Sequence, residues 1–268
     1  MQVLIVGYGS AGKRHAHNAR LLGHEVVVWD DSGRARRAAI DDGFPLADFD
    51  PCWLAEKGAA IIATPAATHH DVARQLLDAG YSGPLFVEKP IDVTTEHAEF
   101  WRSWPHPTAM VGYNWRFVEG VKEAAGGEIG VTVTCTNMDD WPGFGYAGDL
   151  LECSHDIDLH LFLFPQENIE VVRGQEPATW YIRHGGNARG GIYSRAASPT
   201  SRYFGVDADV VYKFFTPDEI AAAVEPSYRA ELAAFLAAAE KGEPVPEAAT
   251  FADGLAVVEI VEQAEAMA

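Results

Sequence analysis

A glycine-rich motif near the amino terminus constrains the fold of this chain more than any other feature. An apolar run at residues 3–6 ends at a G-x-G-x-x-G motif (residues 7–12), and a helix-type stretch continues to residue 22. A buried strand, a tight turn and a helix in this order begin a βαβ unit. Gly7 would make the turn, Gly9 would let the backbone approach a pyrophosphate, and Gly12 would let the helix pack closely. The motif therefore predicts a dinucleotide-binding Rossmann domain.

The residue that ends the second predicted strand bears on which nicotinamide dinucleotide is bound. Asp30 follows the β-branched run at residues 25–29, about twenty residues after the glycine motif, where a carboxylate accepts a hydrogen bond from the adenosine ribose. Its charge would repel a 2′-phosphate, which favours NAD. Arg34, Arg36 and Arg37 follow closely and could hold that phosphate, so NADP remains an alternative. Asp30 could also serve only to cap the turn into the next helix.

Strand-type and helix-type segments alternate up to about residue 112. Further strand-type runs lie at residues 44–46, 59–63 and 85–87, and helical periodicity lies at residues 34–42 and 68–79. Gly80 follows the second of these helices as an expected C-cap. This alternation predicts an α/β domain with a doubly wound parallel sheet over residues 1–112, the NAD(P)-binding Rossmann domain.

The pattern changes in residues 113–268. Strand-type runs lie at residues 129–138, 169–173, 179–183 and 208–214, and helix-type segments lie at residues 150–164, 227–241 and 251–268. We expect a C-terminal α+β domain with an open, largely antiparallel or mixed sheet, which would carry the substrate site and the oligomer contacts. An open sheet leaves one face to cover, so a homodimer or homotetramer is expected.

Charge and cysteine usage narrow the partners and the compartment. The formal net charge of −19 argues against a nucleic-acid partner, because phosphate backbones bind basic faces. Cys52, Cys135 and Cys153 form no C-x-x-C pair, which fits a reducing compartment. No segment reads as a signal peptide or a membrane span. We therefore expect a cytoplasmic protein that acts on a small molecule, with no nucleic-acid or membrane partner.

Motifs along nearly the whole chain resemble one enzyme family. The glycine motif continues as Lys13-Arg14-His15, and later come Ala63-Thr64-Pro65 with His69, Glu88-Lys89-Pro90, GYNWRF at residues 112–117, LLECSHDIDL at residues 150–159 and YRAEL at residues 228–232. In order and spacing they resemble the Gfo/Idh/MocA oxidoreductases, which include glucose–fructose oxidoreductase and inositol dehydrogenase. The resemblance implies an NAD(P)-dependent oxidoreductase that transfers a hydride to or from a hydroxyl or keto carbon of a sugar, sugar nucleotide or cyclitol.

The resemblance also assigns the catalytic roles. Lys89 would hydrogen-bond the reacting carbinol oxygen and the nicotinamide ribose, and His155 would shuttle the proton. Oxidation of an alcohol needs both a base and a cation near the developing alkoxide, which agrees with this pair. Glu152 and Asp158 lie three residues before and after His155, so on a helix a carboxylate would orient the imidazole. Many relatives place an aspartate four residues before the histidine, where this chain has Leu151, so the role of Glu152 stays open. A solvated turn lysine and a histidine paired for packing are the alternatives.

The remaining site residues are expected around these two. The expected cofactor contacts are Gly7, Gly9, Ser10, Ala11, Gly12, Asp30, Thr64, Pro65, His69, Glu88 and Lys89, and the expected contacts to a polyhydroxylated substrate are Tyr113, Asn114, Arg116, Trp141 and Asp158. Trp141 begins a glycine- and aromatic-rich loop placed to act as a lid. The aromatic cluster of Tyr113, Trp115 and Phe117 could stack on a sugar or belong to the core.

No metal site is predicted, and several other functions stay open. His155 and His160 are five residues apart and do not share a helix face, and Cys153 reads as a buried thiol rather than a nucleophile. NAD-assisted glycoside cleavage on the same scaffold would give no net NADH. A non-catalytic dinucleotide-binding regulator need not keep Lys89 and His155. Reduction of a tetrapyrrole is disfavoured by the lysine of the E-K-P segment.

Overall fold

A computed structural model describes residues 1–47, 58–118, 121, 151, 154–165, 168–174, 179–185, 187–193 and 217–267. The chain divides into two compact units: Met1–Gly112 with Tyr228–Ala252, and Tyr113–Ser227 with Asp253–Ala268. The first unit thus includes a helical segment that the sequence analysis grouped with the second domain. In the described parts of the chain, no helix is both long enough and apolar enough to cross a membrane.

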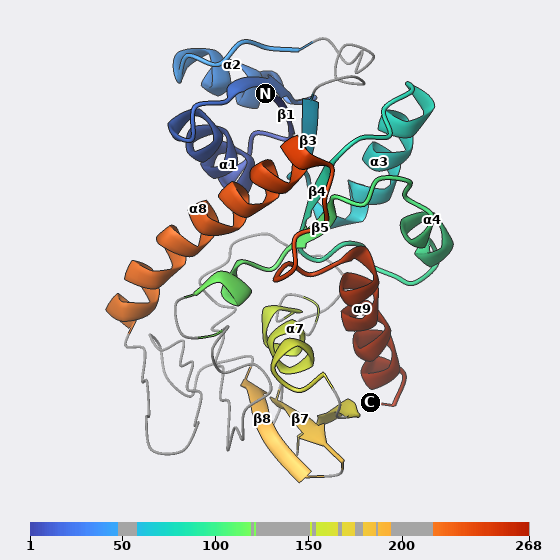
Figure 1. The fold of residues 1–268 in the computed structure, drawn as a ribbon. Helices are drawn as coiled ribbons and strands as arrows, with labels where there is room; N and C mark the ends of the chain where they lie inside the picture. Colours follow the sequence, from blue (N-terminus) through green and yellow to red (C-terminus); the bar gives the residue numbers. More distant parts are fainter. Residues whose placement is uncertain are drawn as a thin grey trace. The chain divides into compact units, whose positions relative to one another are not determined.

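The first unit is built on a parallel sheet of five strands in the order β2-β1-β3-β4-β5 (Figure 1). The strands are β1 (Gln2–Val6), β2 (Glu25–Trp29), β3 (Gly58–Ile62), β4 (Leu85–Glu88) and β5 (Ala109–Gly112). Every residue of β3 and β4 is buried, as a central parallel strand covered by helices on both faces requires. The chain steps from β1 to β2 on one side and then to β3 on the other. The carboxyl ends of β1 and β3 therefore form the switch point where α/β sheets bind ligands.

Helices cover both faces of this sheet. They are α1 (Ser10–Leu21), α2 (Gly33–Asp41), the short η2 (Ala66–Thr68) with α3 (His69–Asp78), α4 (Ala98–Arg102) and α8 (Pro217–Lys241), of which residues 228–241 belong to this unit. In Figure 1, α1 and α8 lie on one side of the strands and α3 lies on the other. Phe235 of α8 packs edge-on against Phe86 of β4 with ring centroids 5.6 Å apart. Gly80 follows α3 with φ +89°, as expected of a C-cap glycine.

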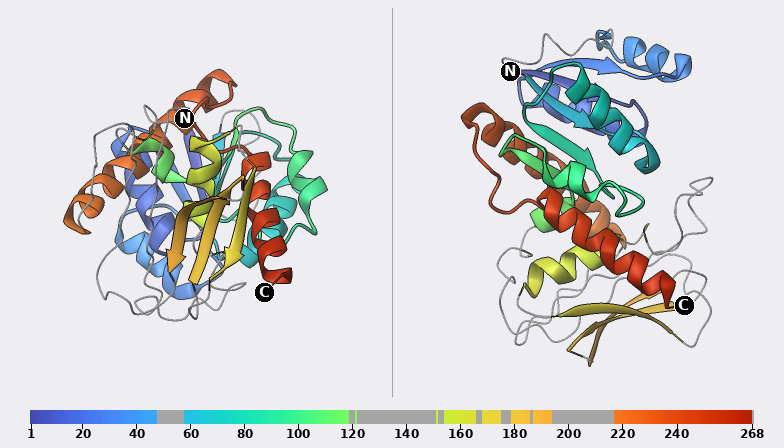
Figure 2. Two further views of the ribbon diagram at one scale, coloured as in Figure 1. Left: turned by 90° about the horizontal axis from the view of Figure 1, so that it is seen from below. Right: turned by 90° about the vertical axis from the view of Figure 1, so that its right-hand side faces the viewer.

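The second unit combines helices with an antiparallel sheet. Its described elements are η3 (Asn114–Phe117), α7 (Ser154–Leu163), β6 (Ile169–Arg173), β7 (Thr179–His184), β8 (Asn187–Tyr193) and most of α9 (Phe251–Ala266). The strands pair in the order β6-β7-β8, and Figure 2 shows them as a twisted layer with α7 on one face. The expected fold class, a Rossmann domain plus an α+β domain with an antiparallel sheet, is confirmed.

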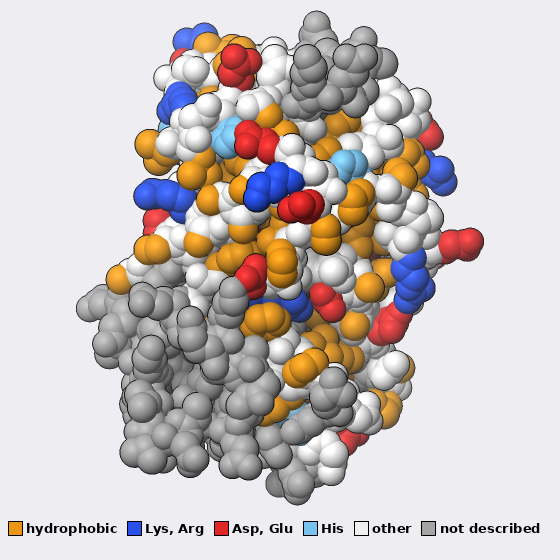
Figure 3. Space-filling view, in the orientation of Figure 1, with side chains coloured by type: hydrophobic (Ala, Val, Ile, Leu, Met, Phe, Trp, Pro, Cys, Tyr) orange, Lys and Arg blue, Asp and Glu red, His pale blue; other side chains and the backbone are white. Residues whose placement is uncertain are grey.

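Several element bounds differ from the sequence expectation. The short strand expected at residues 44–46 is only an isolated bridge between Leu46 and Val28. Helix α8 begins ten residues before the expected start, and α4, β5 and β8 were not predicted. The strands expected at residues 129–138 and 208–214 lie outside the described residues. On the face drawn in Figure 3, Lys and Arg side chains are interspersed with Asp and Glu and form no continuous basic area among the described residues.

Candidate active site

The glycine motif forms a turn that fits a dinucleotide pyrophosphate. Gly7 has φ +93°, and a Cβ there would lie 2.7 Å from the carbonyl oxygen of Ala63. A Cβ on Gly12 would lie 1.9 Å from the carbonyl oxygen of Gly7, so only glycine lets α1 pack this closely on the turn. A Cβ on Gly9 would meet nothing within 4 Å, so the protein leaves the space beside Gly9 open. Gly7 and Gly12 thus leave no room for a side chain, and Gly9 between them leaves space beside the backbone. This is the arrangement that the approach of a pyrophosphate requires.

The amino terminus of α1 is electrostatically suited to phosphate. Its N-cap residue is Gly9, which has no side chain to cap the helix, and its first turn holds no acidic residue. The N–H groups of the first turn have no acceptor within the helix, and the helix dipole adds partial positive charge there. Ser10, Ala11 and Gly12, which the sequence analysis assigned to the cofactor, form this first turn.

Asp30 is fixed beside the same turn. Its Oδ2 accepts a hydrogen bond from the amide of Tyr8 at 2.6 Å, and its Oδ1 accepts one from the amide of Ser32 at 2.8 Å. The contact to Tyr8 places the carboxylate at the glycine turn, as the cofactor prediction requires. The contact to Ser32 supports the turn into α2, which was the alternative role of Asp30. The Asp30 side chain is therefore placed for both roles. Ser32 itself is the N-cap of α2.

The three arginines that follow Asp30 differ in their contacts. Arg36 donates through Nη1 to the carbonyl oxygens of Asp30 and Asp31, each at 2.9 Å. Arg37 forms an exposed ion pair with Asp41, at 3.0 Å between Nε and Oδ1. The guanidinium of Arg36 is therefore already engaged with the backbone beside Asp30.

Lys89 follows β4 directly and is supported by a buried pair of side chains. The Nε2 atom of His15, on α1, lies 2.6 Å from Oε1 of Glu88. The amide of Lys89 donates to the other oxygen, Oε2, at 3.2 Å, and the Lys89-Pro90 bond is cis. Burial raises the pKa of Glu88, but the hydrogen bond and charge of His15 and the charge of Lys89 outweigh burial, so the pKa lies below its usual range. The carboxylate beside Lys89 is therefore held in its charged form.

His69 links the ends of two neighbouring strands. Its ring is fully buried, with Nδ1 2.9 Å from the carbonyl oxygen of Pro90 and Nε2 2.9 Å from that of Thr64. Burial lowers the pKa of His69. The ring thus ties the Thr64-Pro65 turn after β3 to the Lys89-Pro90 turn after β4. It supports the edge of the predicted cofactor site from inside the protein.

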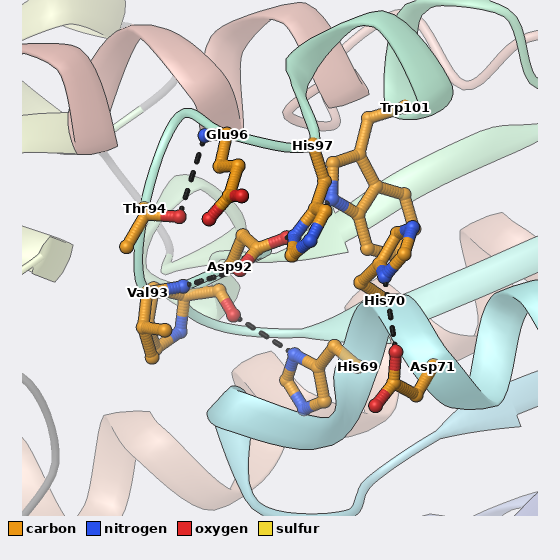
Figure 4. Close-up of polar contacts among 10 residues, drawn as sticks. His69, His70, Asp71, Asp92, Val93, Thr94, Glu96, His97 and Trp101 are labelled. Carbon is orange, nitrogen blue, oxygen red and sulfur yellow. Dashed lines mark hydrogen bonds and ion pairs between the residues drawn. The ribbon is translucent and has the colours of Figure 1, made fainter.

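A cluster of polar and aromatic side chains anchors the chain just beyond Pro90 (Figure 4). The buried carboxylate of Asp92 accepts hydrogen bonds from Trp101 Nε1 at 2.8 Å and from His97 Nδ1 at 3.0 Å, and it also accepts the amide of Val93. The His97 ring stacks on His70 with centroids 3.6 Å apart. Three donors on Asp92 therefore fix the start of the segment that follows the lysine.

In the second unit, the candidate histidine lies among aromatic rings. His155 is half-buried near the start of α7, with ring centroids 5.6 Å from Tyr113 and 6.2 Å from Trp115. Burial raises the pKa of Tyr113. The structure thus brings together the helix and the aromatic segment that the sequence analysis assigned to substrate chemistry. Glu152, Cys153 and Trp141 lie outside the described residues.

Two predicted substrate residues are paired with each other. Arg116 donates to both carboxylate oxygens of Asp158, at 2.9 Å from Nε and 2.6 Å from Nη2, and both side chains are almost fully buried. Burial raises the pKa of Asp158 and the Arg116 guanidinium opposes that shift. Asn114 donates to the hydroxyl of Ser227 at 2.8 Å. The Arg116–Asp158 pair fastens η3 to α7, and the Asn114 hydrogen bond joins η3 to residue 227 of α8. The expected substrate contacts of Arg116, Asp158 and Asn114 stay predictions.

The sequence analysis missed His15 as a site residue. The signal was present, because His15 belongs to the Lys13-Arg14-His15 extension of the glycine motif, but its partner Glu88 is 73 residues away. Within the described residues, no three His, Cys, Asp or Glu side chains are grouped so that they could hold a metal ion.

Comparisons with known proteins agree with this geometry. Residues 1–101 match a protein family described as an oxidoreductase family with an NAD-binding Rossmann fold. The whole chain resembles UDP-N-acetylglucosamine 3-dehydrogenase from Acidithiobacillus ferrooxidans, with a TM-score of 0.80 and 19% identity over 99% of this chain and 97% of that chain. At this identity the likeness shows a shared fold.

Two further solved structures contain nicotinamide cofactors. GenD2 from gentamicin A biosynthesis, in complex with NAD, gives a TM-score of 0.74 at 20% identity over 99% of this chain and 93% of that chain. Biliverdin reductase from Synechocystis sp., in complex with biliverdin and NADP+, gives 0.69 at 16% identity over 99% and 98%. The chain is also 31% identical over 83 residues to UDP-N-acetylmuramoylalanine–D-glutamate ligase from Ruegeria pomeroyi. That match covers 29% of this chain and only 18% of the ligase.

Proposed function

We propose that this chain, whose residues 1–101 match the Gfo/Idh/MocA oxidoreductase family with its NAD-binding Rossmann fold, is a nicotinamide-dependent dehydrogenase. The reaction proposed is hydride transfer between the cofactor and a hydroxyl or keto carbon of a sugar, sugar nucleotide or cyclitol. The observation that carries the proposal is the position of Lys89. It stands at the carboxyl end of β4, on the sheet edge where the glycine turn also lies, and Glu88 and His69 hold its segment.

The residues of the chain divide the chemical work. A bound nicotinamide would supply the hydride acceptor for oxidation of the carbinol carbon. The ammonium of Lys89 would donate a hydrogen bond to the carbinol oxygen and stabilise negative charge as the O–H bond breaks. The imidazole of His155 would accept the hydroxyl proton and return it in the reverse direction. Tyr113 and Trp115 beside His155 supply aromatic surface of the kind that stacks on a sugar ring.

We propose NAD rather than NADP as the cofactor. Asp30 presents a carboxylate at the glycine turn, where it would accept a hydrogen bond from the ribose hydroxyl and repel a 2′-phosphate. Arg36 already donates to two backbone carbonyls, so its guanidinium is less available to a phosphate.

The sugar class is supported by the named relatives of the same fold. One is a UDP-N-acetylglucosamine 3-dehydrogenase and another acts in gentamicin A biosynthesis. A thermal-shift screen of sugars, sugar nucleotides and cyclitols with NAD present tests the proposal. A ligand present at about a hundred times its Kd should stabilise the folded state by about 2.7 kcal/mol. Reduction of NAD by each hit then separates net oxidation from NAD-assisted glycoside cleavage, which gives no net NADH. If no member of the panel raises the melting temperature, the sugar class is wrong.

We further propose that the protein is a cytoplasmic homodimer or homotetramer. Its three cysteines without a C-x-x-C pair fit a reducing compartment, and an antiparallel sheet such as β6–β8 is a structure through which copies of a chain can associate. Light scattering at micromolar concentration measures the oligomeric state. A particle with the mass of one 29.1 kDa chain would contradict it.

A further inference from the structure

We propose that His15 is a positioning residue for Lys89, and that it acts through the carboxylate of Glu88. The inference rests on the proposed function, since it assumes that Lys89 touches the substrate. It adds His15 of α1 to the residues of the candidate active site. It also assigns Glu88 to the positioning of Lys89, whereas the sequence analysis expected Glu88 to contact the cofactor.

His15 is held in one orientation by packing. Its side chain is fully buried, and its ring meets Phe86 edge-on at 4.9 Å and Tyr228 edge-on at 6.4 Å between centroids. Its Nε2 lies 2.6 Å from Glu88 Oε1, and a carboxylate only accepts, so the imidazole donates this hydrogen bond. The other ring nitrogen, Nδ1, has no hydrogen-bond partner among the described residues. All the polar interaction of this ring that the structure describes is thus directed at Glu88.

Glu88 connects the fixed ring of His15 to the backbone of Lys89. Its two carboxylate oxygens have different partners: Oε1 accepts from His15 and Oε2 accepts from the amide of Lys89. Strand β5 also passes close to the carboxylate, because a Cβ on Gly112 would lie 3.4 Å from Glu88 Cδ. With a partner on each oxygen and a strand against its side, the carboxylate is engaged inside the protein. Its contacts point to a role in orienting Lys89.

The same helix therefore serves two parts of the site. The amino terminus of α1 faces the predicted pyrophosphate position, and one turn further along the helix His15 reaches Glu88. A buried charge needs its hydrogen-bond partners, and loss of one leaves the other unpaired. If His15 no longer donates, Glu88 loses the partner that keeps it against the amide of Lys89, and the lysine segment loosens.

The first test measures the Lys89 segment without cofactor or substrate. His15→Leu removes the donor with little change in volume, His15→Gln keeps an N–H near the position of Nε2, and His17→Leu is the matched control on the same helix. NMR-detected exchange of the Lys89 amide should be faster by about tenfold in His15→Leu, and within about twofold of the parent in the other two. Exchange at Ile61 in β3 reports global stability. If His15→Leu does not fold, His15→Asn, whose side chain is too short to reach Glu88, replaces it.

The second test uses the substrate found in the ligand screen. In His15→Leu, kcat should fall by about ten- to a hundredfold, while KM and the Kd for NAD stay within about threefold, because the phosphate contacts are unchanged. His15→Gln should restore kcat to within about threefold of the parent. A parallel loss of NAD affinity, or an unchanged exchange rate at Lys89, would overturn the proposal. If no substrate is turned over by the parent protein, the proposed function fails, and the exchange measurement alone still decides whether His15 positions Lys89.

Discussion

Substituting Gly9 by alanine should separate cofactor binding from folding. Gly9 has φ −76° and ψ −160°, a conformation that alanine adopts, and its Cβ would meet no protein atom within 4 Å. Gly9 is the N-cap of α1, where alanine is less favourable than glycine, so the free energy of unfolding should fall by at most about 1 kcal/mol. The new methyl group would occupy the space through which the pyrophosphate approaches the backbone. NAD affinity should therefore fall at least about tenfold, or about 1.4 kcal/mol.

Gly12→Ala is the matched comparison, because its Cβ would lie 1.9 Å from the carbonyl oxygen of Gly7. Helix α1 would have to move away from the turn. The free energy of unfolding of this variant should therefore fall by about 3 kcal/mol, and its NAD affinity should fall as well. Urea unfolding without cofactor measures the first quantity, and quenching of tryptophan fluorescence by NAD measures the second. If Gly9→Ala binds NAD as tightly as the parent, the glycine turn is a structural feature and the cofactor assignment is refuted.

Three further predictions concern Asp30, the buried pair of the second unit and a buried histidine. Asp30→Ala should narrow the preference for NAD over NADP by about 1–2 kcal/mol, measured by titrating both cofactors, and an unchanged ratio would show that Asp30 does not discriminate. Arg116→Met should destabilise the protein by about 3–5 kcal/mol in urea, because it leaves the Asp158 carboxylate buried and unpaired, whereas Arg116→Met with Asp158→Leu should recover most of the loss. Burial, and to a smaller extent the charge of the neighbouring His184, lowers the pKa of His160 to about 3. Below about pH 6.5 the unfolded chain therefore binds more protons at this residue than the folded protein does. Stability should therefore fall by about 1 kcal/mol per pH unit between pH 6 and pH 4 through this residue, and an unchanged slope in His160→Gln would refute the assignment.

The Rossmann half was predictable because its signals are local. Gly7, Gly9 and Gly12 lie within six residues, and each strand or helix carries its own apolar pattern. The elements that were missed have weak local signals. Strand β5 and helix α4 are only four and five residues long, and β8 contains Gly190 and Gly191, which are uncommon inside strands.

Helix α8 shows a different limit of local patterns. It continues through Pro226, a residue that usually ends a helix, so a start at residue 227 is the natural expectation from sequence. The expected pattern was correct from residue 227 onward, and only the first ten residues of the helix were missed.

The contacts among the candidate site residues could not be predicted from the sequence. Arg116 and Asp158 were both assigned to the substrate, yet they are 42 residues apart in sequence and bind each other. His15 and Glu88 meet across 73 residues. Which buried polar group pairs with which depends on how strands and helices pack. No periodicity or spacing in the sequence carries that information.

The most direct test of the central claim compares the parent protein with Lys89→Met. Both are incubated with NAD and the sugar, sugar nucleotide or cyclitol identified in the ligand screen, and the absorbance of the reduced nicotinamide is followed. The parent should reduce NAD, and Lys89→Met should lose turnover by about a thousandfold or more while its Kd for NAD stays within about threefold. Equal rates of NAD reduction in the two proteins would contradict the assignment of Lys89 and, with it, the proposed mechanism.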